Sequence, residues 1–355
     1  MKVLLTGSFG NVGKNALLEL VKKGYEVRAF DIKTQRNVEV ERRVFRQLKK
    51  EEKGFEVIWG DIRDKKIIEK IVQGVDVIVH LAAIIPPLAY EKPDFAFSVN
   101  VLGSKSLIEC AEKEQKKNNK EIQFIYASSI AVHGNRMKYP PPTKVTDPLK
   151  PLNYDNYASH KITVENFLRE SKLNWTILRF GVVTPFEISY KIPPIMFEIP
   201  LSQRIEVVDT RDVGLACANA VRNKEAIGKI FFIGGGDGNR MLQCEYIRGM
   251  LGAMGIGMLP EESFKPINSE EDYYHCDWMD TEEAQRVLKF QRFNFEDFLR
   301  EFKRKRMLIR TIIILFKPIA RAVLLSKSPY YNKDKTLKQH KTRKKVKDQK
   351  VTVPS

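Results

Sequence analysis

The chain has 355 residues, 43% of them hydrophobic, which is enough to bury one large core or two smaller ones. Its net charge of +17 is concentrated at one end. From Glu301 onward there are 17 lysines and arginines but only three acids, so that residues 1–300 carry only +3. The charge therefore does not mark the folded part as a nucleic-acid binder.

Two further features of the composition bear on location and metal binding. Four cysteines, Cys110, Cys217, Cys244 and Cys276, lie far apart, which is typical neither of a disulfide framework nor of a zinc site. We therefore expect no metal. The N-terminal stretch lacks the layout of a signal peptide, so we expect a cytoplasmic protein.

The first thirteen residues predict a buried strand that runs into a glycine-rich turn. Residues 3–5 are apolar, and apolar positions recur at helical spacing from Ala16 to Val21. Between them stands Thr6-Gly7-Ser8-Phe9-Gly10-Asn11-Val12-Gly13. At such a corner Gly7 permits a tight turn, Gly10 lets a pyrophosphate approach the backbone, and Gly13 lets the helix lie close. The stretch predicts a phosphate-binding corner.

An acidic residue, Asp31, ends the next predicted strand, residues 26–30. In a dinucleotide-binding unit an acid at this place accepts hydrogen bonds from the adenosine ribose and repels a 2′-phosphate, which favours NAD over NADP. Asp31 can instead be a turn residue at the strand end. The nearby Lys33 and Arg36 leave NADP open. Residues 36–53 are highly charged and predict a solvated helix.

Three more strands are predicted at residues 55–59, 75–80 and 122–127, and they alternate with helices. This alternation predicts a parallel sheet with ligands at the carboxyl ends of the strands. Asp61 contacts adenine or caps a helix at residues 65–72. We interpret His80 as a packing residue. A proline-bearing loop at residues 84–93 precedes a helix at residues 94–117, which carries Asn100.

The fifth strand leads to Ser128-Ser129, and a proline-rich loop then precedes a helix that we expect to begin at Asn153. Tyr157 and Lys161 lie four residues apart on this helix, so their side chains share one face. Such a pair is most often a surface pair. Here it follows a serine at a strand end, in a sheet with a predicted nucleotide corner, which favours a catalytic interpretation.

Together these motifs resemble the extended short-chain dehydrogenase/reductase superfamily, and within it the NAD-dependent epimerase/dehydratase family. The resemblance spans residues 1 to about 302. Its matching pieces are Thr6-Gly7-x-x-Gly10-x-x-Gly13, Asp31, Gly60-Asp61, His80-Leu81-Ala82-Ala83, Asn100 with Gly103, Ser128-Ser129, Tyr157-x-x-x-Lys161, Leu178-Arg179-Phe180, Asp209-Thr210-Arg211-Asp212-Val213-Gly214, and Asp277-Trp278 with Ala284 and Leu288.

The resemblance implies a fold, a division into domains and a set of site residues. The fold is a Rossmann-type doubly wound parallel α/β sheet with a small C-terminal α/β substrate lobe. Residues 1–181, with 205–235 returning to the sheet, form the NAD-binding domain, and residues 182–204 and 236–302 form the lobe. The expected cofactor contacts are Gly7, Phe9, Gly10, Asn11, Val12, Gly13, Asp31, Asp61, Ile62, Leu81, Ala82, Ala83, Asn100, Tyr157, Lys161 and Phe180.

The resemblance also assigns roles to the three candidate catalytic residues. Tyr157 exchanges a proton with a substrate hydroxyl while a hydride moves to or from NAD. A free phenol has a pKa near 10, so we expect the Lys161 ammonium and the nicotinamide charge to lower it. Lys161 also holds the cofactor ribose. Ser129 hydrogen-bonds the reacting oxygen.

Several positions depart from the family pattern. Ile130-Ala131 replaces the Asp-Glu pair of the family's dehydratases, so dehydration is not expected. His133 stands where tyrosine is common, and Val182 replaces an asparagine that contacts nucleotide sugars. Residues 185–204 are short and apolar. These departures indicate a more apolar substrate pocket.

Residues 303–355 extend beyond the resemblance and predict a basic amphipathic helix with a disordered lysine-rich tail at residues 333–350. Over residues 303–325, five basic side chains (Lys303, Arg306, Arg310, Lys317 and Arg321) share one face, and the opposite face is apolar. The longest uncharged run, residues 311–316, is too short to span a bilayer. We expect this helix, kinked near Pro318, to lie on the inner face of an anionic membrane. Alternatively it docks on the protein or on a second subunit.

The sequence thus predicts an NAD-dependent enzyme that oxidises and re-reduces a sugar hydroxyl, on a nucleotide sugar, as a homodimer. One alternative is a dehydrogenase or reductase of an apolar or lipid-linked alcohol. Another is a sensor or scaffold that binds NAD without turnover. Nucleic-acid binding is not expected, because the basic tail has no aromatic platform or recognised motif.

Overall fold

The computed structural model describes residues 1–48, 54–184 and 195–331. The lysine-rich tail at 333–350 and the first half of the apolar stretch at 185–204, residues 185–194, lie outside these residues. The chain forms two compact units. The first contains Met1–Phe186, Ile205–Arg240 and His275–Phe295, and the second contains Glu187–Arg204, Met241–Tyr274 and Glu296–Ser355.

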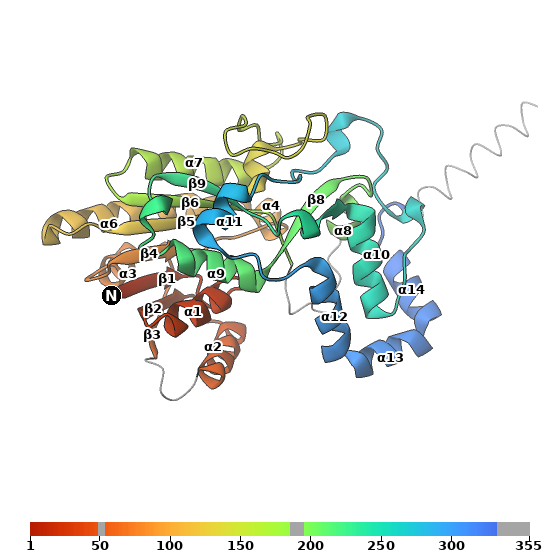
Figure 1. The fold of residues 1–355 in the computed structure, drawn as a ribbon, viewed down its shortest axis with the longest axis horizontal. Coiled ribbons are helices and arrows are strands. Elements are labelled where there is room, and N and C mark those ends of the chain that lie inside the picture. Colours follow the sequence, from red (N-terminus) through yellow and green to blue (C-terminus); the bar gives the residue numbers. More distant parts are fainter. Residues whose placement is uncertain (49–53, 185–194, 332–355) are drawn as a thin grey trace, which may run out of the picture. The chain divides into compact units, whose positions relative to one another are not determined.

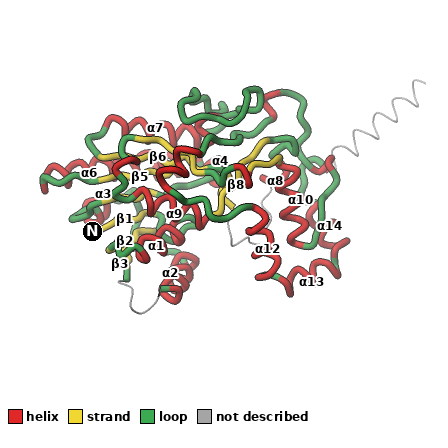
Figure 2. The backbone as a smooth tube through the Cα atoms, viewed as in Figure 1, coloured by secondary structure: helices red, strands yellow, loops and turns green. Residues whose placement is uncertain are grey.

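A seven-stranded parallel sheet forms the centre of the first unit (Figures 1 and 2). In spatial order its strands are β3 (Phe55–Trp59), β2 (Glu26–Asp31), β1 (Lys2–Thr6), β4 (Val77–His80), β5 (Gln123–Ser129), β6 (Asn174–Phe180) and β9 (Lys229–Ile233). The order reverses at β1, which pairs with β2 on one side and with β4 on the other. Such a switch point opens a crevice at the carboxyl ends of the strands. The predicted Rossmann-type sheet is confirmed.

Helices cover both faces of this sheet, and alternate side chains of the strands explain why. On β1, Val3 and Leu5 pack into one apolar cluster, while Leu4 points into another on the opposite face. The first cluster lies under α1 (Gly13–Lys22), α2 (Gln35–Gln47), α9 (Thr210–Ala220) and α11 (Glu282–Leu288). The second lies under α3 (Lys65–Ile71), α6 (Ser104–Asn118) and α7 (Asn156–Glu170).

Two of the helices differ in detail from the sequence prediction. The helix expected at residues 94–117 is α5 (Pro93–Phe97), a π-helical segment (Ser98–Gly103) and α6 in succession. The helix α7 begins at Asn156 rather than at Asn153, because Asp155 is its N-cap. The Asp155 carboxylate accepts a hydrogen bond from the Ala158 N–H at 3.0 Å, and this contact fixes the helix start.

The remaining elements of the first unit are short. They are α4 (Leu88–Glu91), β7 (Val182–Thr184), β8 (Arg204–Asp209), and 3₁₀ turns at Ile130–His133, Lys224–Ala226 and Asp237–Asn239. The strand β7 pairs in parallel with β8. At β10 (Arg240–Leu242) the chain passes from the first unit to the second.

The second unit is mainly helical. It contains α8 (Ile195–Glu198), α10 (Gln243–Met254), 3₁₀ turns at Glu261–Ser263 and Glu270–Asp272, and three C-terminal helices, α12 (Phe295–Lys305), α13 (Met307–Leu315) and α14 (Lys317–Leu325). The prediction of a single kinked helix at residues 303–325 is therefore wrong. The backbone leaves the helical region at Arg306, between α12 and α13, and again at Phe316, between α13 and α14. Within the described residues, no helix is long and apolar enough to cross a bilayer.

Candidate active site

The glycine-rich corner connects β1 to α1 as predicted. Gly7 adopts φ +70°, and a Cβ on Gly13 would lie 1.9 Å from the Gly7 carbonyl oxygen, so neither position accepts a side chain. A Cβ on Gly10 would meet only the Gly7 carbonyl, at 3.3 Å. Val12 at the start of α1 is already helical, and no side chain caps this end of the helix. The N-terminal amides and the helix dipole thus remain available to an anion.

A cavity of about 250 Å³ lies beside this corner, at the carboxyl ends of β1, β2, β3 and β4. Eight of the predicted cofactor contacts line it: Gly7, Gly10, Asp31, Asp61, Ile62, Leu81, Ala82 and Ala83. Phe30, Ile32, Arg36, Asn37, Gly60, Ile84, Phe95 and Val99 complete the lining. Phe95 and Val99 come from the helix that was predicted after the proline-bearing loop, and its apolar spacing was the signal that could have identified them.

Asp31 lines this cavity and is held by backbone groups. Its carboxylate accepts hydrogen bonds from the N–H groups of Phe9 and Ile32, both at 2.8 Å, and from the Asn37 amide at 3.2 Å. Burial raises the pKa of Asp31, and the two backbone N–H groups oppose that rise. The side chain of Arg36 donates to Asn11 at 3.1 Å, so a cation lies near the acid, as the sequence suggested.

Asp61 also lines the cavity, but it does not cap a helix. The N-cap of α3 is Asp64, whose carboxylate accepts from the Lys66 and Ile67 N–H groups. The capping alternative for Asp61 is therefore wrong. Asp61 instead pairs with the Arg63 guanidinium at 2.6 Å, and this contact lowers the pKa of its carboxyl group.

The three candidate catalytic residues converge at the end of β5. Ser129 is the last residue of β5, and Tyr157 and Lys161 lie on successive turns of α7. The Ser129 hydroxyl lies close enough to Tyr157 to lower the pKa of its phenol, and it accepts a hydrogen bond from the Ala131 N–H at 3.2 Å. The Lys161 ammonium lies 5.6 Å from the centre of the Tyr157 ring and donates to the Ala127 carbonyl at 2.6 Å. The predicted helical spacing thus brings these side chains together.

The electrostatics of this group differ from the expectation. Burial and the Asp155 carboxylate raise the pKa of Tyr157, whereas the hydrogen bond with Ser129 lowers it. Burial also lowers the pKa of Lys161 to about 7, against the opposing charge of Glu165. Lys161 is only 4% exposed, and it is Ser129 rather than Lys161 that lowers the pKa of Tyr157. A lysine with a pKa of about 7 is only partly charged at neutral pH, so it favours the phenolate less than a fully charged ammonium group would.

A buried ion pair fixes α7 to the sheet behind these residues. The Arg179 guanidinium on β6 donates to both carboxylate oxygens of Glu165, at 2.6 and 3.0 Å, and Ser128 donates to the same carboxylate at 2.5 Å. Arg179 also donates to His133 Nε2 at 3.0 Å. Because arginine has no acceptor, His133 accepts here in its neutral form, and burial and Arg179 lower its pKa to about 3.

Three other residues considered in the sequence analysis, Asn100, Phe180 and His80, have contacts that indicate their structural roles. Asn100 holds the neighbouring loop in place. Its amide oxygen accepts a hydrogen bond from the Ile84 N–H at 2.7 Å, and its amide nitrogen donates to the Ile84 carbonyl at 2.8 Å. Phe180 is opposite Ser129 in the register of β5 and β6. His80 is a packing residue, as interpreted from the sequence. It is buried between the hydroxyls of Thr6 and Ser104, at 2.7 and 2.8 Å.

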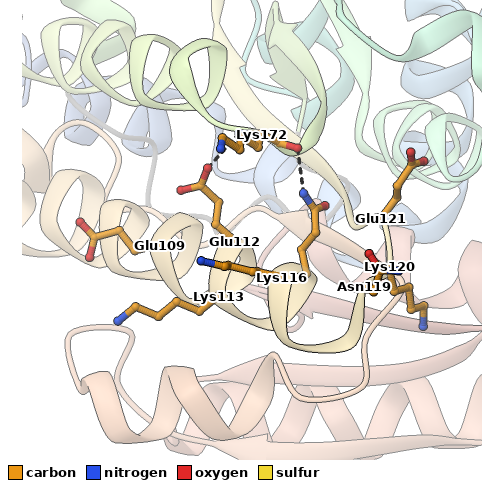
Figure 3. A pocket seen from close by; sticks show the side chains of 9 residues that line it. Glu109, Glu112, Lys113, Lys116, Asn119, Lys120, Glu121 and Lys172 are labelled. Carbon is orange, nitrogen blue, oxygen red and sulfur yellow. Dashed lines mark hydrogen bonds between the residues drawn. The ribbon is translucent and has the colours of Figure 1, made fainter.

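A larger hollow of about 820 Å³ contains none of the predicted site residues (Figure 3). Charged and polar side chains from α6 and the turn after it line this hollow, together with Lys172. Lys172 is joined to α6 by its backbone groups, which bond Glu112 and Gln115 at 2.8 and 2.9 Å. Its size alone does not make it a site, since most of its lining side chains are solvent-exposed charged groups of α6 and the turn after it.

The glycine corner, the cavity and the Ser129, Tyr157 and Lys161 group all lie within the stretch that a known family model covers. The model described as GDP-mannose 4,6 dehydratase matches residues 4–178. Over these residues, just under half of its length, the chain is similar to this family of extended short-chain dehydrogenases/reductases, as the sequence motifs indicated.

Individual relatives match parts of the chain at low identity. A UDP-glucose 4-epimerase of Lactobacillus helveticus is 28% identical over 191 residues, 51% of each chain. A 3-beta-hydroxysteroid dehydrogenase of Mycolicibacterium neoaurum is 33% identical over 136 residues, 37% of this chain and 32% of the relative. The matched part spans about half the length of the epimerase and less of the dehydrogenase.

The chain shares its fold with solved structures. A UDP-glucose-4-epimerase from Stenotrophomonas maltophila, with bound NAD and formylated UDP-arabinopyranose, superposes with a TM-score of 0.71 at 19% identity. The superposition covers 86% of this chain and 99% of that one.

Proposed function

We propose that this protein is an NAD-dependent enzyme that epimerises or oxidises a sugar hydroxyl, on a nucleotide sugar. The observation that carries the proposal is the convergence of Ser129, Tyr157 and Lys161 at the end of β5, in the same sheet as a glycine corner that can hold a pyrophosphate. The UDP-glucose 4-epimerase matches and the NAD in the solved relative support it.

The residues of the first unit fit the cofactor. The uncapped N-terminus of α1 would hold the pyrophosphate against Gly10, and the 250 Å³ cavity would hold the adenosine, with Asp31 accepting from the ribose hydroxyls. The Asp31 carboxylate repels a 2′-phosphate, so NAD is preferred to NADP. Leu81, Ala82 and Ala83 present only small or apolar side chains to the same cavity, which suits a close approach of the ring system.

Each catalytic residue then has a defined task. When bound, NAD would supply the hydride acceptor for the carbinol carbon and, in an epimerisation, the hydride donor that restores the hydroxyl-bearing carbon. Tyr157 Oη takes the hydroxyl proton as the carbonyl forms and gives it back when the hydroxyl is restored. Ser129 donates to the reacting oxygen and keeps the phenol oriented. Lys161, in its charged form, favours the phenolate and donates to the cofactor ribose.

The residues after Ser129 favour epimerisation or oxidation over dehydration. Elimination of water from the sugar needs an acid beside the leaving hydroxyl. In this chain Ile130 and Ala131 follow Ser129, and both are buried in the 3₁₀ turn. Neither can donate a proton. We therefore propose that the protein lacks the dehydratase activity after which the matching family model is described.

One observation favours a second candidate, the oxidation or reduction of an apolar alcohol. Of the relatives described above, the 3-beta-hydroxysteroid dehydrogenase has the higher identity, 33%. In addition, Val182, the first residue of β7, has an apolar side chain. The same Tyr157, Lys161 and Ser129 chemistry would serve this substrate. The two candidates differ only in the group that carries the hydroxyl.

A substrate panel distinguishes these candidates. Purified protein with NAD would be mixed with UDP-, dTDP- and GDP-sugars and with sterol and polyprenyl alcohols, and the absorbance of reduced nicotinamide and the sugar products would be followed. The proposal predicts an epimerised or oxidised product from one nucleotide-sugar class. Turnover of apolar alcohols alone would select the second candidate. No turnover with tight NAD binding would favour the non-catalytic alternative.

A further inference from the structure

The helices α13 and α14 are amphipathic, but most of their apolar side chains face outward, although Leu324 on α14 is buried. Leu308 is 79% exposed, Leu315 73% and Phe316 57%. Met307, Ile309, Ile312, Ile314, Ile319 and Val323 are also exposed. No residue of α13 is buried. A helix on the surface of a protein in water normally turns such residues toward the core.

The basic side of the same helices faces the protein instead. The Arg321 guanidinium donates to the carbonyls of Ile256, Gly257 and Met258, the closest at 2.7 Å. These carbonyls directly follow α10, whose C-terminal dipole favours a cation. Arg310 packs on Gly255, and its Nε atom is buried. The expected arrangement, with Arg310 and Arg321 turned toward lipid head groups, is therefore wrong.

Hydrogen bonds within the second unit hold the chain after α14. The Ser328 hydroxyl donates to the Ser263 carbonyl at 2.5 Å, and the Tyr330 hydroxyl bonds the Glu198 carboxylate. In Figure 1, α13 and α14 follow α12 and lie near α10. Polar contacts thus fix the C-terminal end of the α13–α14 pair, whereas most of its apolar side chains stay exposed.

We propose that the exposed apolar face of α13 and α14 inserts into the interface of a lipid bilayer that carries anionic head groups. Contiguous apolar patches of this kind on a protein mark a membrane or a protein partner. An interfacial helix buries its apolar face at the boundary between head groups and acyl chains. The two helices lie in the plane of the bilayer and do not cross it.

Charge selects lipid over a second copy of the chain. The described residues 302–331 contain eight lysines and arginines and no acid. Lys303 and Arg304 in the last turn of α12, and Lys327 after α14, are exposed at the two ends of the apolar face. A symmetric contact between two copies would bring these like charges together. Anionic head groups complement them instead.

The test is flotation of the full-length protein with vesicles. With phosphatidylcholine vesicles that contain about a third phosphatidylglycerol, we expect binding that weakens in high salt and without the anionic lipid. Leu308→Gln with Leu315→Gln should reduce partitioning at least about tenfold. These side chains are exposed, so the thermal unfolding transition should not change. Ile227→Gln with Ile267→Gln is the matched control, since it removes exposed apolar side chains elsewhere and should bind as the wild type.

Membrane binding does not require the proposed chemistry, so Tyr157→Phe should also bind vesicles as the wild type does. Failure of the wild-type protein to float with anionic vesicles at low salt would overturn the proposal. Unchanged flotation of the Leu308 and Leu315 double variant would also overturn it. So would a wild-type dimer that ignores vesicles and that this double variant dissociates, because a second copy would then cover the face.

Discussion

Removal of the Glu165 charge should destabilise the protein strongly. Glu165 and Arg179 are each about 1% exposed, and two hydrogen bonds join them, at 2.6 and 3.0 Å. In Glu165→Gln the Arg179 guanidinium stays buried without a counter-charge, and breaking a buried pair in this way costs about 3–5 kcal/mol. We therefore expect a loss of about this size in the free energy of unfolding, measured by urea titration at neutral pH.

Two control variants separate the buried charge from other effects. Replacing both partners, in Glu165→Leu with Arg179→Met, should recover much of the loss, because no charge then remains buried. Breaking the exposed pair of Lys229 and Glu283, with Glu283→Gln, should cost less than about 1 kcal/mol. If Glu165→Gln unfolds within about 1 kcal/mol of the wild type, then the pair does not hold α7 on the sheet as described.

Two more predictions concern the cofactor and pH. Asp31→Asn removes the charge that accepts from the ribose, so NADH affinity should fall about tenfold or more and the preference over NADPH should shrink, as measured by fluorescence titration. An unchanged preference would mean that Asp31 is only a turn residue. Lys161 has a pKa of about 7 in the fold and an ordinary value of 10.5. Since the unfolded chain binds its proton more tightly, the free energy of unfolding should rise with pH between about 7 and 10. Lys161→Met should lose that part of the slope, and an equal slope in both proteins would contradict the low pKa.

Local sequence patterns were sufficient for the sheet and the cofactor corner. The apolar run on β1 and the three glycines after it specify a strand, a turn and a helix through backbone geometry alone, so their positions followed from residue type and spacing. The acid at the end of β2 and the spacing of Tyr157 and Lys161 could be interpreted in the same way. In each case the deciding contacts are made by the backbone or by neighbours in the same helix.

Features that depend on distant partners could not be predicted. Asp61 and Asp64 are both acids before a helix, and only the backbone path shows that Asp64 is the cap. The Glu165 and Arg179 pair joins two elements that a sequence pattern treats separately. The C-terminal helices show a further reason. An amphipathic period shows that two faces differ, but the direction in which each points depends on what packs beside it, here the carbonyls after α10 that bind Arg321.

The central claim is that Tyr157 carries the proton in an NAD-dependent reaction. The most direct measurement compares the wild type with Tyr157→Phe, using NAD affinity by titration and single-turnover reduction of NAD with the active substrate of the panel. Tyr157→Phe should keep the NAD affinity and slow the hydride step by about 10²- to 10⁴-fold. A variant that binds NAD normally and reacts at the wild-type rate would contradict the claim.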